Sequence, residues 1–337
     1  MSSKIRVGVI GVGSIGKNHA RVVSEIKEAQ FTAIYDTNFA AAQEMASKFN
    51  TKAVASLEEF VDLVDAASVA TPTPTHHSVG MMLLGKGKHV LIEKPIAEST
   101  EHAQELADLA HSKGLVLQVG HIERFNPVLG ALEELLTAPR FIESHRLSPY
   151  PNRSTEIGVV LDLMIHDLEI ILHLVRSPVK SVDAVGVPVL SKGEDIANAR
   201  IRFENGCVAN LTASRISPEK MRKIRVFQEN AYLSLDYQAQ EGYIFRLGDS
   251  EAKESSLLKK LLSAKDSAIV SEFAGRKIVR EPVEIEKGEP LKRELQSFIE
   301  CCSNGVAPKV SGYQATAALD LALQITHQIE EHGKKHL

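Results

Sequence analysis

The stretch KIRVGVIGVGSIGKNH, residues 4–19, joins a β-branched apolar run to a glycine-rich turn. The run predicts a buried strand, and the residues after it predict a helix that extends to about Ile26. The junction has the pattern G-x-G-x-x-G, whose glycines permit a tight turn and bring a pyrophosphate close to backbone amides at a helix N-terminus. In this context the pattern predicts a dinucleotide-binding loop, and a glycine-rich turn without a ligand is the alternative. The residues expected to contact the cofactor here are Gly11, Gly13, Ser14, Ile15 and Gly16.

An acidic residue follows at the distance that a dinucleotide site requires. Asp36 ends the next predicted strand, FTAIYD, about 20 residues after the loop. An aspartate at this place accepts hydrogen bonds from the adenosine ribose hydroxyls and repels a 2′-phosphate. Thr37 and Asn38 come next, so no arginine follows directly to bind that phosphate. The sequence therefore favours NAD over NADP.

Strands and helices alternate through the first third of the chain, which predicts a doubly wound α/β domain with a parallel sheet. After about residue 123, strand-like runs follow one another with short turns up to residue 247. These runs predict an α+β domain with an open, mostly antiparallel sheet. Residues 249–277 are charged and are expected to form a loop with a short helix. We expect an NAD-binding domain at 1–122 and a substrate-binding and oligomerisation domain at 123–337, with the last helix able to pack back on the first.

The composition is that of an ordinary globular protein, with 44% hydrophobic and 24% charged residues among 337. A net charge of -4 gives no basic surplus for binding nucleic acid. The apolar runs are too short and too interrupted by charge to span a bilayer, and the N-terminus has no signal-peptide pattern. The cysteines Cys207, Cys301 and Cys302 form no C-x-x-C pair. A reducing cytoplasm is therefore the expected location.

Two further predicted strands end in polar residues. In HVLIEKP, Lys94 lies just beyond the strand end, where ligands of parallel sheets bind, and the following proline favours an extended backbone. A solvated loop charge is the alternative, but the adjacent acid and the upstream cofactor motif favour a site. His76 follows the preceding strand and either lines the cofactor groove or caps the next helix. The residues expected to contact the cofactor at these strand ends are Thr71, Pro72, His76, Glu93 and Lys94.

The stretch LDLMIHDLEIILHLV, Leu161–Val175, is an apolar helix with a polar stripe. Asp162, His166, Glu169 and His173 are spaced by four, three and four residues, which places them on one helix face. One alternative is a surface pair that contributes only about 0.2–0.5 kcal/mol. A metal site is another, but no third ligand is evident, so no metal is expected. The last two residues of the stripe are predicted to be structural or interfacial.

In this order, these elements resemble the glucose–fructose oxidoreductase/inositol dehydrogenase/MocA family. The matching segments are the glycine loop, ATPTPTH, EKP, QVGHIERFNP and the D-x-x-x-H pair, and together they extend to about residue 240. The resemblance implies a Rossmann domain followed by an open-sheet domain whose face mediates dimers or tetramers. It also implies that Lys94, Asp162 and His166 line the place where substrate meets nicotinamide.

The resemblance implies an enzyme that oxidises a sugar alcohol with NAD. An imidazole titrates near working pH, so His166 is the natural base for the hydroxyl proton. Asp162 either orients the ring or binds a second hydroxyl, and Lys94 stabilises negative charge on the reacting oxygen. Within the family, either the lysine or the histidine takes the proton, so both assignments stay open. Met164 stands where many members have glycine, as D-x-G-x-H, so their sugar specificity does not transfer directly.

The segments GHIERFNP and GVVLDLMIHDLEIIL most resemble the branch that oxidises UDP-N-acetylglucosamine at its 3-hydroxyl. A diphosphate requires cations, and the candidates are Arg124, Arg146, Arg153, Arg215 and Lys220, each of which is alternatively a solvated charge. The expected substrate contacts are Arg124, Asn126, Arg153 and Asp162. The alternatives are a dehydrogenase of inositol or a free sugar, a non-catalytic NAD-binding regulator on the same fold, and an enzyme that retains NAD through each turnover.

Overall fold

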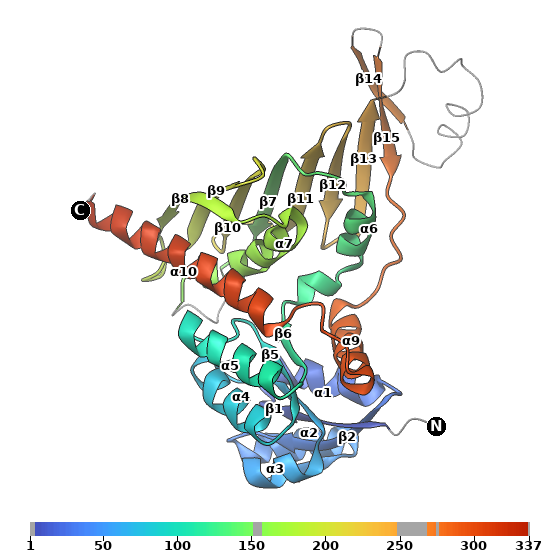
Figure 1. Cartoon of the computed structure of the whole chain (residues 1–337), viewed down its shortest axis with the longest axis vertical. Coiled ribbons are helices and arrows are strands. Elements are labelled where there is room, and N and C mark those ends of the chain that lie inside the picture. Colours follow the sequence, from blue (N-terminus) through green and yellow to red (C-terminus); the bar gives the residue numbers. More distant parts are fainter. Residues whose placement is uncertain (1–3, 151–156, 248–267, 274–275, 336–337) are drawn as a thin grey trace. The chain divides into compact units, whose positions relative to one another are not determined.

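The computed structural model describes residues 4–150, 157–247, 268–273 and 276–335. The chain divides into two compact units (Figure 1). The first consists of Met1–Phe125 and Glu289–Asp320, and the second of Asn126–Gly288 and Leu321–Leu337. Both units therefore draw on the C-terminal segment, whereas the sequence suggested a boundary at residue 122 with only the last helix returning.

The first unit contains a six-stranded parallel sheet in the order β3-β2-β1-β4-β5-β6, which confirms the predicted doubly wound domain. The order reverses between β1 and β4, and ligands of open α/β sheets bind at such a switch point. The strands are β1 (Ile5–Ile10), β2 (Ala29–Tyr35), β3 (Lys52–Val54), β4 (Ala66–Val69), β5 (His89–Glu93) and β6 (Leu117–Gly120).

The helices of the first unit follow their strands in alternation and begin at recognisable caps. The side chains of Asn38, Ser56 and Ser99 accept hydrogen bonds from the first turns of α2, α3 and α5, respectively. The helices up to residue 125 are α1 (Gly16–Glu25), α2 (Phe39–Phe49), α3 (Leu57–Leu63), η1 (Thr73–Thr75), α4 (His76–Gly85), α5 (Thr100–Ser112) and η2 (Ile122–Phe125).

A helix from the end of the chain completes the core of the first unit. Helix α9 (Pro290–Asn304) packs on α1 and β1. Its buried Leu295 and Phe298 belong to the same apolar cluster as Val7, Val9 and Val22. The long helix α10 (Gly312–Lys335) then contributes residues to both units. Among the residues that the structure describes, no helix combines the length and apolar character needed to cross a membrane.

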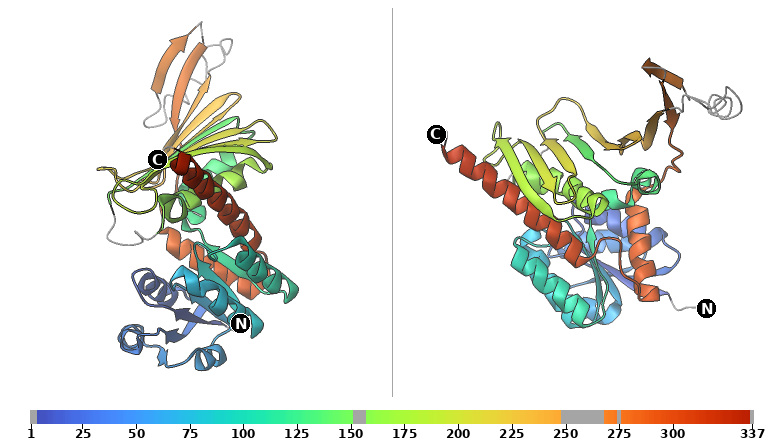
Figure 2. Two further views of the ribbon diagram at one scale, coloured as in Figure 1. Left: turned by 90° about the vertical axis from the view of Figure 1, so that its left-hand side faces the viewer. Right: turned by 45° about the horizontal axis from the view of Figure 1, so that its top comes forward.

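The second unit contains a nine-stranded sheet in the order β14-β15-β13-β12-β11-β7-β10-β9-β8 (Figure 2). Among the strands that the structure describes in this unit, only the β7–β10 pair is parallel, so the predicted mostly antiparallel sheet is confirmed. Its strands are β7 (Phe141–Leu147), β8 (Val179–Val187), β9 (Ile196–Phe203), β10 (Val208–Ser214), β11 (Met221–Gln228), β12 (Ala231–Asp236), β13 (Glu241–Leu247), β14 (Ala268–Phe273) and β15 (Arg276–Pro282).

Helices cover one face of this sheet. Helix α6 (Pro127–Leu135) contacts β12, and the π-helical turn η3 (Val160–Met164) contacts β10 and leads into α7 (Ile165–Val175). On the covered face the strands bury apolar side chains such as Ile142, Val226 and Leu233. The opposite face carries polar and aromatic side chains that are half-buried or exposed.

Two strand regions differ from the sequence prediction. Part of the 249–277 segment, expected to be a loop with a short helix, forms β14 and the start of β15; much of the rest lies outside the described residues. Charged residues surround the β-branched pairs of these strands and obscured the pattern. Strand β7 was not predicted because two of its buried positions are Ser144 and Arg146. The arginine is tolerated there because Asp167 of α7 accepts hydrogen bonds from it at 2.7 and 3.0 Å.

Candidate active site

The glycine loop between β1 and α1 has the geometry of a phosphate cradle. Gly11 has a φ of 83°, and a Cβ atom there would lie 2.7 Å from the carbonyl oxygen of Ala70. A Cβ atom on Gly16 would lie 1.8 Å from the carbonyl oxygen of Gly11, so only glycine lets the helix start this close to the strand. A Cβ atom on Gly13, in contrast, meets nothing within 4 Å. The second glycine thus leaves open the side from which a pyrophosphate approaches, while Ser14 and Ile15 are exposed beside it.

Asp36 lies beside this loop, at the end of β2. Its Oδ2 atom accepts a hydrogen bond from the backbone N–H of Val12 at 2.8 Å, and its Oδ1 atom accepts one from the N–H of Asn38 at 2.8 Å. A carboxylate has about four acceptor positions, so both oxygens retain capacity for ribose hydroxyls. The glycine cradle and the fixed acid together fit an NAD molecule.

The ends of β4 and β5 are tied together by His76. This residue opens α4 and is buried, and its ring nitrogens lie 2.8 Å from the carbonyl oxygens of Pro95 and Thr71. Burial lowers the pKa of His76. Thr71 also accepts a hydrogen bond from the hydroxyl of Thr75, at 2.7 Å, while Pro72 is exposed. His76 therefore fixes the two strand-end loops that carry the predicted cofactor contacts.

Glu93 and Lys94 follow at the end of β5. The Glu93 carboxylate is buried, lies 3.1 Å from Nε2 of His19, and accepts a hydrogen bond from the backbone N–H of Lys94 at 3.2 Å. His19 in turn lies 2.7 Å from the hydroxyl of Ser68. Burial alone would raise the pKa of Glu93, but the contact with His19 and the charge of Lys94 outweigh it, so the pKa is lowered. An ionised acid thus lies directly behind the half-buried lysine.

A second buried acid near Glu93 was not predicted from the sequence. Glu294 of α9 is fully buried, and neither of its carboxyl oxygens has a hydrogen-bond partner among the described residues. Burial and the charge of Glu93 raise the pKa of Glu294 well above its usual value. The two buried carboxyl groups are therefore shifted in opposite directions, with the pKa of Glu93 lowered and that of Glu294 raised. The sequence did carry a signal, because Glu294 falls three residues after Leu291 and four before Phe298, inside the apolar stripe of its helix.

His121, after β6, belongs to the same buried polar cluster. Burial and the positive charge of Lys94 lower the pKa of His121 to about 3, and the charge of Arg124 acts in the same direction. His121 is therefore neutral at physiological pH. The packing is tight, since a Cβ atom on Gly120 would lie 2.8 Å from the carboxylate of Glu93.

In the second unit, Asp162 and His166 lie one turn apart and both are partly exposed. The turn that carries Asp162 is π-helical rather than the predicted α-helical, and α7 begins only at Ile165. Such π turns are rare and occur frequently at functional sites. Met164 is fully buried, so it does not share the face of the pair, as expected from its spacing. Among the described residues, no group of three or more His, Cys, Asp or Glu side chains could hold a metal ion.

The far end of the polar stripe has structural partners. Nε2 of His173 lies 2.7 Å from the carboxylate of Glu133 on α6, so this contact joins two helices of the same unit. Glu169 is buried.

The predicted substrate cations have different environments. Arg124 is buried in the first unit, and one of its Nη atoms donates to the carbonyl oxygen of Lys309 at 3.5 Å. Asn126 caps α6 and donates to the carbonyl oxygen of Tyr237 at 3.1 Å. Arg146 and Arg215 are neither solvated nor exposed to a ligand, because each forms a buried ion pair, with Asp167 and Asp195 respectively. Lys220 is exposed, and Arg153 lies outside the described residues.

Two family models match the chain. The model for the oxidoreductase family with an NAD-binding Rossmann fold matches residues 5–121. The model for the GFO/IDH/MocA C-terminal domain matches residues 135–234. The chain belongs to the GFO/IDH/MocA oxidoreductase family. The resemblance stated from the sequence is thereby confirmed, as are the oxidoreductase class and the NAD cofactor.

Full-length relatives of this GFO/IDH/MocA protein act on different hydroxyl compounds. UDP-N-acetylglucosamine 3-dehydrogenase from Acidithiobacillus ferrooxidans is 33% identical over 327 residues, which cover 97% of each chain. A solved structure of that enzyme, GnnA, has a TM-score of 0.88 and covers 97% of this chain and 98% of its own. The scyllo-inositol 2-dehydrogenase (NAD(+)) of Bacillus subtilis is 26% identical, covering 97% of this chain and 94% of its own.

The position of Asp36 leads to a test of cofactor preference. Asp36→Asn keeps an oxygen that accepts from Val12 but removes the charge that repels a 2′-phosphate. We expect the preference for NAD over NADP, measured as the ratio of kcat/KM values, to fall by at least about tenfold, because a like-charge contact costs several kcal/mol. Asp62→Asn, at an exposed position of α3, is the control and should leave the ratio unchanged. An unchanged ratio in Asp36→Asn would show that the Asp36 carboxylate does not lie at the ribose site.

Proposed function

We propose that this protein oxidises a secondary hydroxyl of a sugar to a ketone with NAD, and that the substrate is a nucleotide sugar, with the 3-hydroxyl of UDP-N-acetylglucosamine as the first candidate. The observation that carries the proposal is the 33% identity to the UDP-N-acetylglucosamine 3-dehydrogenase, which extends over 97% of both chains. The presence of Lys94, Asp162 and His166 supports it, since a regulator that performs no chemistry has no need of all three.

The glycine loop and Asp36 would hold the cofactor, with Thr71, Pro72 and the ordered β4 and β5 loops beside it. When bound, NAD supplies the acceptor for the hydride. The side chain of Lys94 donates a hydrogen bond to the reacting oxygen and stabilises the negative charge that develops there. The imidazole of His166 takes the hydroxyl proton, and Asp162 orients that ring or binds a neighbouring hydroxyl. Lys94 is the other candidate for the base.

A diphosphate would be bound by cations of this chain. Arg124 is the first candidate, because it lies in η2, shortly after the last strand of the Rossmann sheet, and Arg153 and Asn126 are the others. Arg146 and Arg215 are left out, since their guanidinium groups are already paired with buried carboxylates. The three cysteines are buried and free, which supports the expected cytoplasmic location.

The decisive experiment is a mass-spectrometric screen of nucleotide sugars for loss of two hydrogens in the presence of NAD, with NADH absorbance as a second readout. We expect turnover of UDP-N-acetylglucosamine. Turnover of an inositol instead would favour the alternative suggested by the scyllo-inositol 2-dehydrogenase relative. If UDP-sugars, inositols and free sugars all fail and a tight protein partner is found, the protein is a regulator. Cofactor retained through purification would identify an enzyme that recycles its NAD.

We also propose that two copies associate through the open face of the nine-stranded sheet. Four half-buried aromatic rings cross β7, β11, β12 and β13 on that face, with successive centroids 5.7, 4.8 and 4.6 Å apart. Aromatic side chains are enriched in the cores of protein interfaces. A second copy of the same sheet is the occupant that would cover the row. The residues of this aromatic row are Phe141, Phe227, Tyr232 and Phe245.

Tyr232→Arg is expected to convert the dimer or tetramer into smaller species, because a charge would replace an aromatic ring at the centre of the buried patch. Light scattering coupled to size exclusion measures the mass directly. Phe39→Arg, at an exposed aromatic of the first unit, is the matched control and should leave the mass unchanged. An unchanged mass in Tyr232→Arg would exclude this face as the interface.

A further inference from the structure

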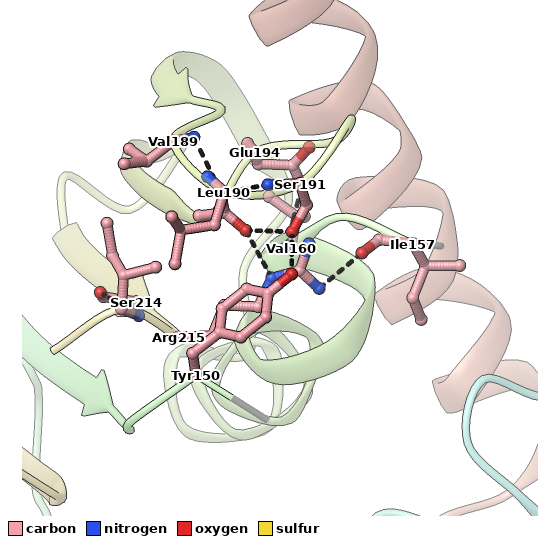
Figure 3. Close-up of polar contacts among 11 residues, drawn as sticks. Tyr150, Ile157, Val160, Val189, Leu190, Ser191, Glu194, Ser214 and Arg215 are labelled. Carbon is pink, nitrogen blue, oxygen red and sulfur yellow. Dashed lines mark hydrogen bonds and ion pairs between the residues drawn. The ribbon is translucent and has the colours of Figure 1, made fainter. Parts of the chain in front are cut away.

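The chain that leads into Asp162 and His166 is held by residues far away in the sequence. The π turn η3 has no side-chain cap of its own. Instead, the N–H of Val159 donates to the backbone oxygen of Glu194 at 2.9 Å, and the N–H of Val160 donates to Oε1 of Glu194 at 3.1 Å. Arg215 donates from Nη1 to the carbonyl oxygen of Ile157 at 2.7 Å. Figure 3 shows Glu194 and Arg215 on either side of this segment.

Arg215 forms a buried ion pair with Asp195, the residue that follows Glu194 in the chain. Nε of Arg215 donates to Oδ1 of Asp195 at 2.8 Å, and both side chains are 0% exposed. The other carboxylate oxygen of Asp195 accepts hydrogen bonds from three consecutive backbone N–H groups, at 2.5 to 2.9 Å. Burial alone would raise the pKa of Asp195, but these hydrogen bonds and those from Ser191 and Arg215 hold it well below its usual range. These additional hydrogen bonds offset part of the cost of burying the two charges. The donating backbone groups are those of Val189, Leu190 and Ser191 (Figure 3).

Glycine at position 158 makes the contact with Glu194 close. A Cβ atom on Gly158 would lie 1.9 Å from Oε1 of Glu194 and 2.2 Å from its Cδ. Gly158 does not have a positive φ, so the backbone conformation there is compatible with alanine. The methyl group of an alanine would clash with the Glu194 side chain. The carbonyl oxygen of Gly158 also accepts a hydrogen bond from the N–H of Asp162 at 3.1 Å. A displacement of residues 157–160 would therefore also displace Asp162.

We propose that Glu194 is a positioning residue that caps the π turn and so fixes the placement of Asp162 and His166, with the Asp195–Arg215 ion pair holding it in place. A carboxylate at a helix start binds orphan N–H groups and is favoured by the helix dipole. The expected effect on kcat rests on the proposed function, whereas the expected effect on the order of residues 157–168 does not.

Glu194→Met removes the oxygen acceptor while keeping side-chain length. We expect kcat for the sugar to fall about 100-fold, as for a misplacement of about 1 Å, with the KM for NAD unchanged. Glu194→Gln keeps an oxygen that accepts from Val160 and should recover most of the lost kcat. Gly158→Ala should reproduce the loss, because its methyl group displaces the carboxylate. Ser56→Ala, which removes the cap of α3, is the matched control and should leave kcat unchanged.

Hydrogen exchange measured by mass spectrometry gives a readout that needs no substrate. In Glu194→Met and Gly158→Ala, peptides that cover residues 157–168 should exchange at least about tenfold faster, since the lost bonds held their first amides. Peptides of β11 and β12 in the same unit should not change, and neither should any of these peptides in Ser56→Ala.

The two readouts separate the two proposals. Faster exchange in the variants, with no sugar turned over by the wild type, would overturn the proposed function and leave the positioning role intact. Wild-type exchange and wild-type kcat in both Glu194→Met and Gly158→Ala would overturn the positioning role. A loss in Glu194→Gln as large as in Glu194→Met would also overturn it, because the amide retains the acceptor.

Discussion

We expect Lys94→Met to lower kcat by about 100- to 1,000-fold, which is the usual effect of removing one group that stabilises developing charge on oxygen. Methionine keeps the length of the side chain and loses the ammonium group. The lysine follows β5 at the sheet edge that carries the glycine loop, and the ionised Glu93 lies behind it. The dissociation constant for NAD should change little, because the proposed phosphate and ribose contacts lie at the ends of β1 and β2. Stopped-flow turnover and fluorescence titration with NAD measure the two quantities separately.

Lys113→Met is the control for the loss of a lysine, since its Nζ atom donates to the carbonyl oxygen of Gly85 on the surface. It should leave both kcat and NAD binding unchanged. Loss of NAD binding and turnover together in Lys94→Met would give the lysine a structural role. A wild-type kcat in Lys94→Met would show that Lys94 takes no part in the reaction.

Glu294→Gln is expected to stabilise the protein, and by an amount that grows with pH. The side chain is fully buried without a hydrogen-bond partner among the described residues, and the charge of Glu93 lies near it. The folded protein therefore holds a proton on Glu294 that the unfolded chain releases above about pH 4.3. Glutamine has nearly the same shape and no proton to release.

The sign of this pH dependence follows from the different numbers of protons that the folded and unfolded states bind. Above pH 4.3 the native state binds more protons at this site than the unfolded state does, so the free energy of unfolding of the wild type falls as pH rises, until the raised pKa of Glu294 is passed. The advantage of Glu294→Gln should grow by up to about 1.4 kcal/mol per pH unit in that window. His121 acts in the opposite direction. Its pKa of about 3 means that stability is lost as pH falls below about 6.5, where the unfolded histidine takes up a proton.

Urea denaturation of both proteins at each unit from pH 5 to about pH 9 gives the difference directly. Glu300→Gln, at an exposed position of the same helix, is the control and should show a difference that does not depend on pH. A constant difference for Glu294→Gln, or one that shrinks as pH rises, would mean that Glu294 is ionised in the folded protein.

Much of the first unit could be predicted because its chemistry is local. The glycine loop, Asp36 and Lys94 follow the ends of β1, β2 and β5, respectively, so in each case a short window of sequence contains both the strand and the residue that it positions. The same holds for the spacing of Asp162 and His166. The π turn that carries Asp162 was not predictable, because its first residues donate hydrogen bonds to Glu194, more than thirty residues away.

Long-range pairs explain the other differences. Arg146 and Arg215 were predicted to be ligands for a phosphate or solvated charges, and each is instead paired in the interior with an aspartate about 20 residues away in the chain. Strand β7 was hidden for the same reason, since Arg146 occupies a position where an apolar residue is expected. Glu294 is the reverse case, an acid in an apolar stripe whose pKa is raised by burial and by the charge of Glu93.

Helix α9 has a consequence for how the protein is made. The apolar cluster around β1 and α1 includes Leu291, Leu295, Phe298 and Ile299, which are synthesised near the end of the chain. Domains normally fold in order as they leave the ribosome. Here the Rossmann core cannot close until nearly all of the second unit has been translated, so the nascent first unit presents an uncovered apolar surface for most of synthesis. A fragment that ends at Phe125 would keep that surface exposed, and coexpression with residues 289–320 is the way to cover it.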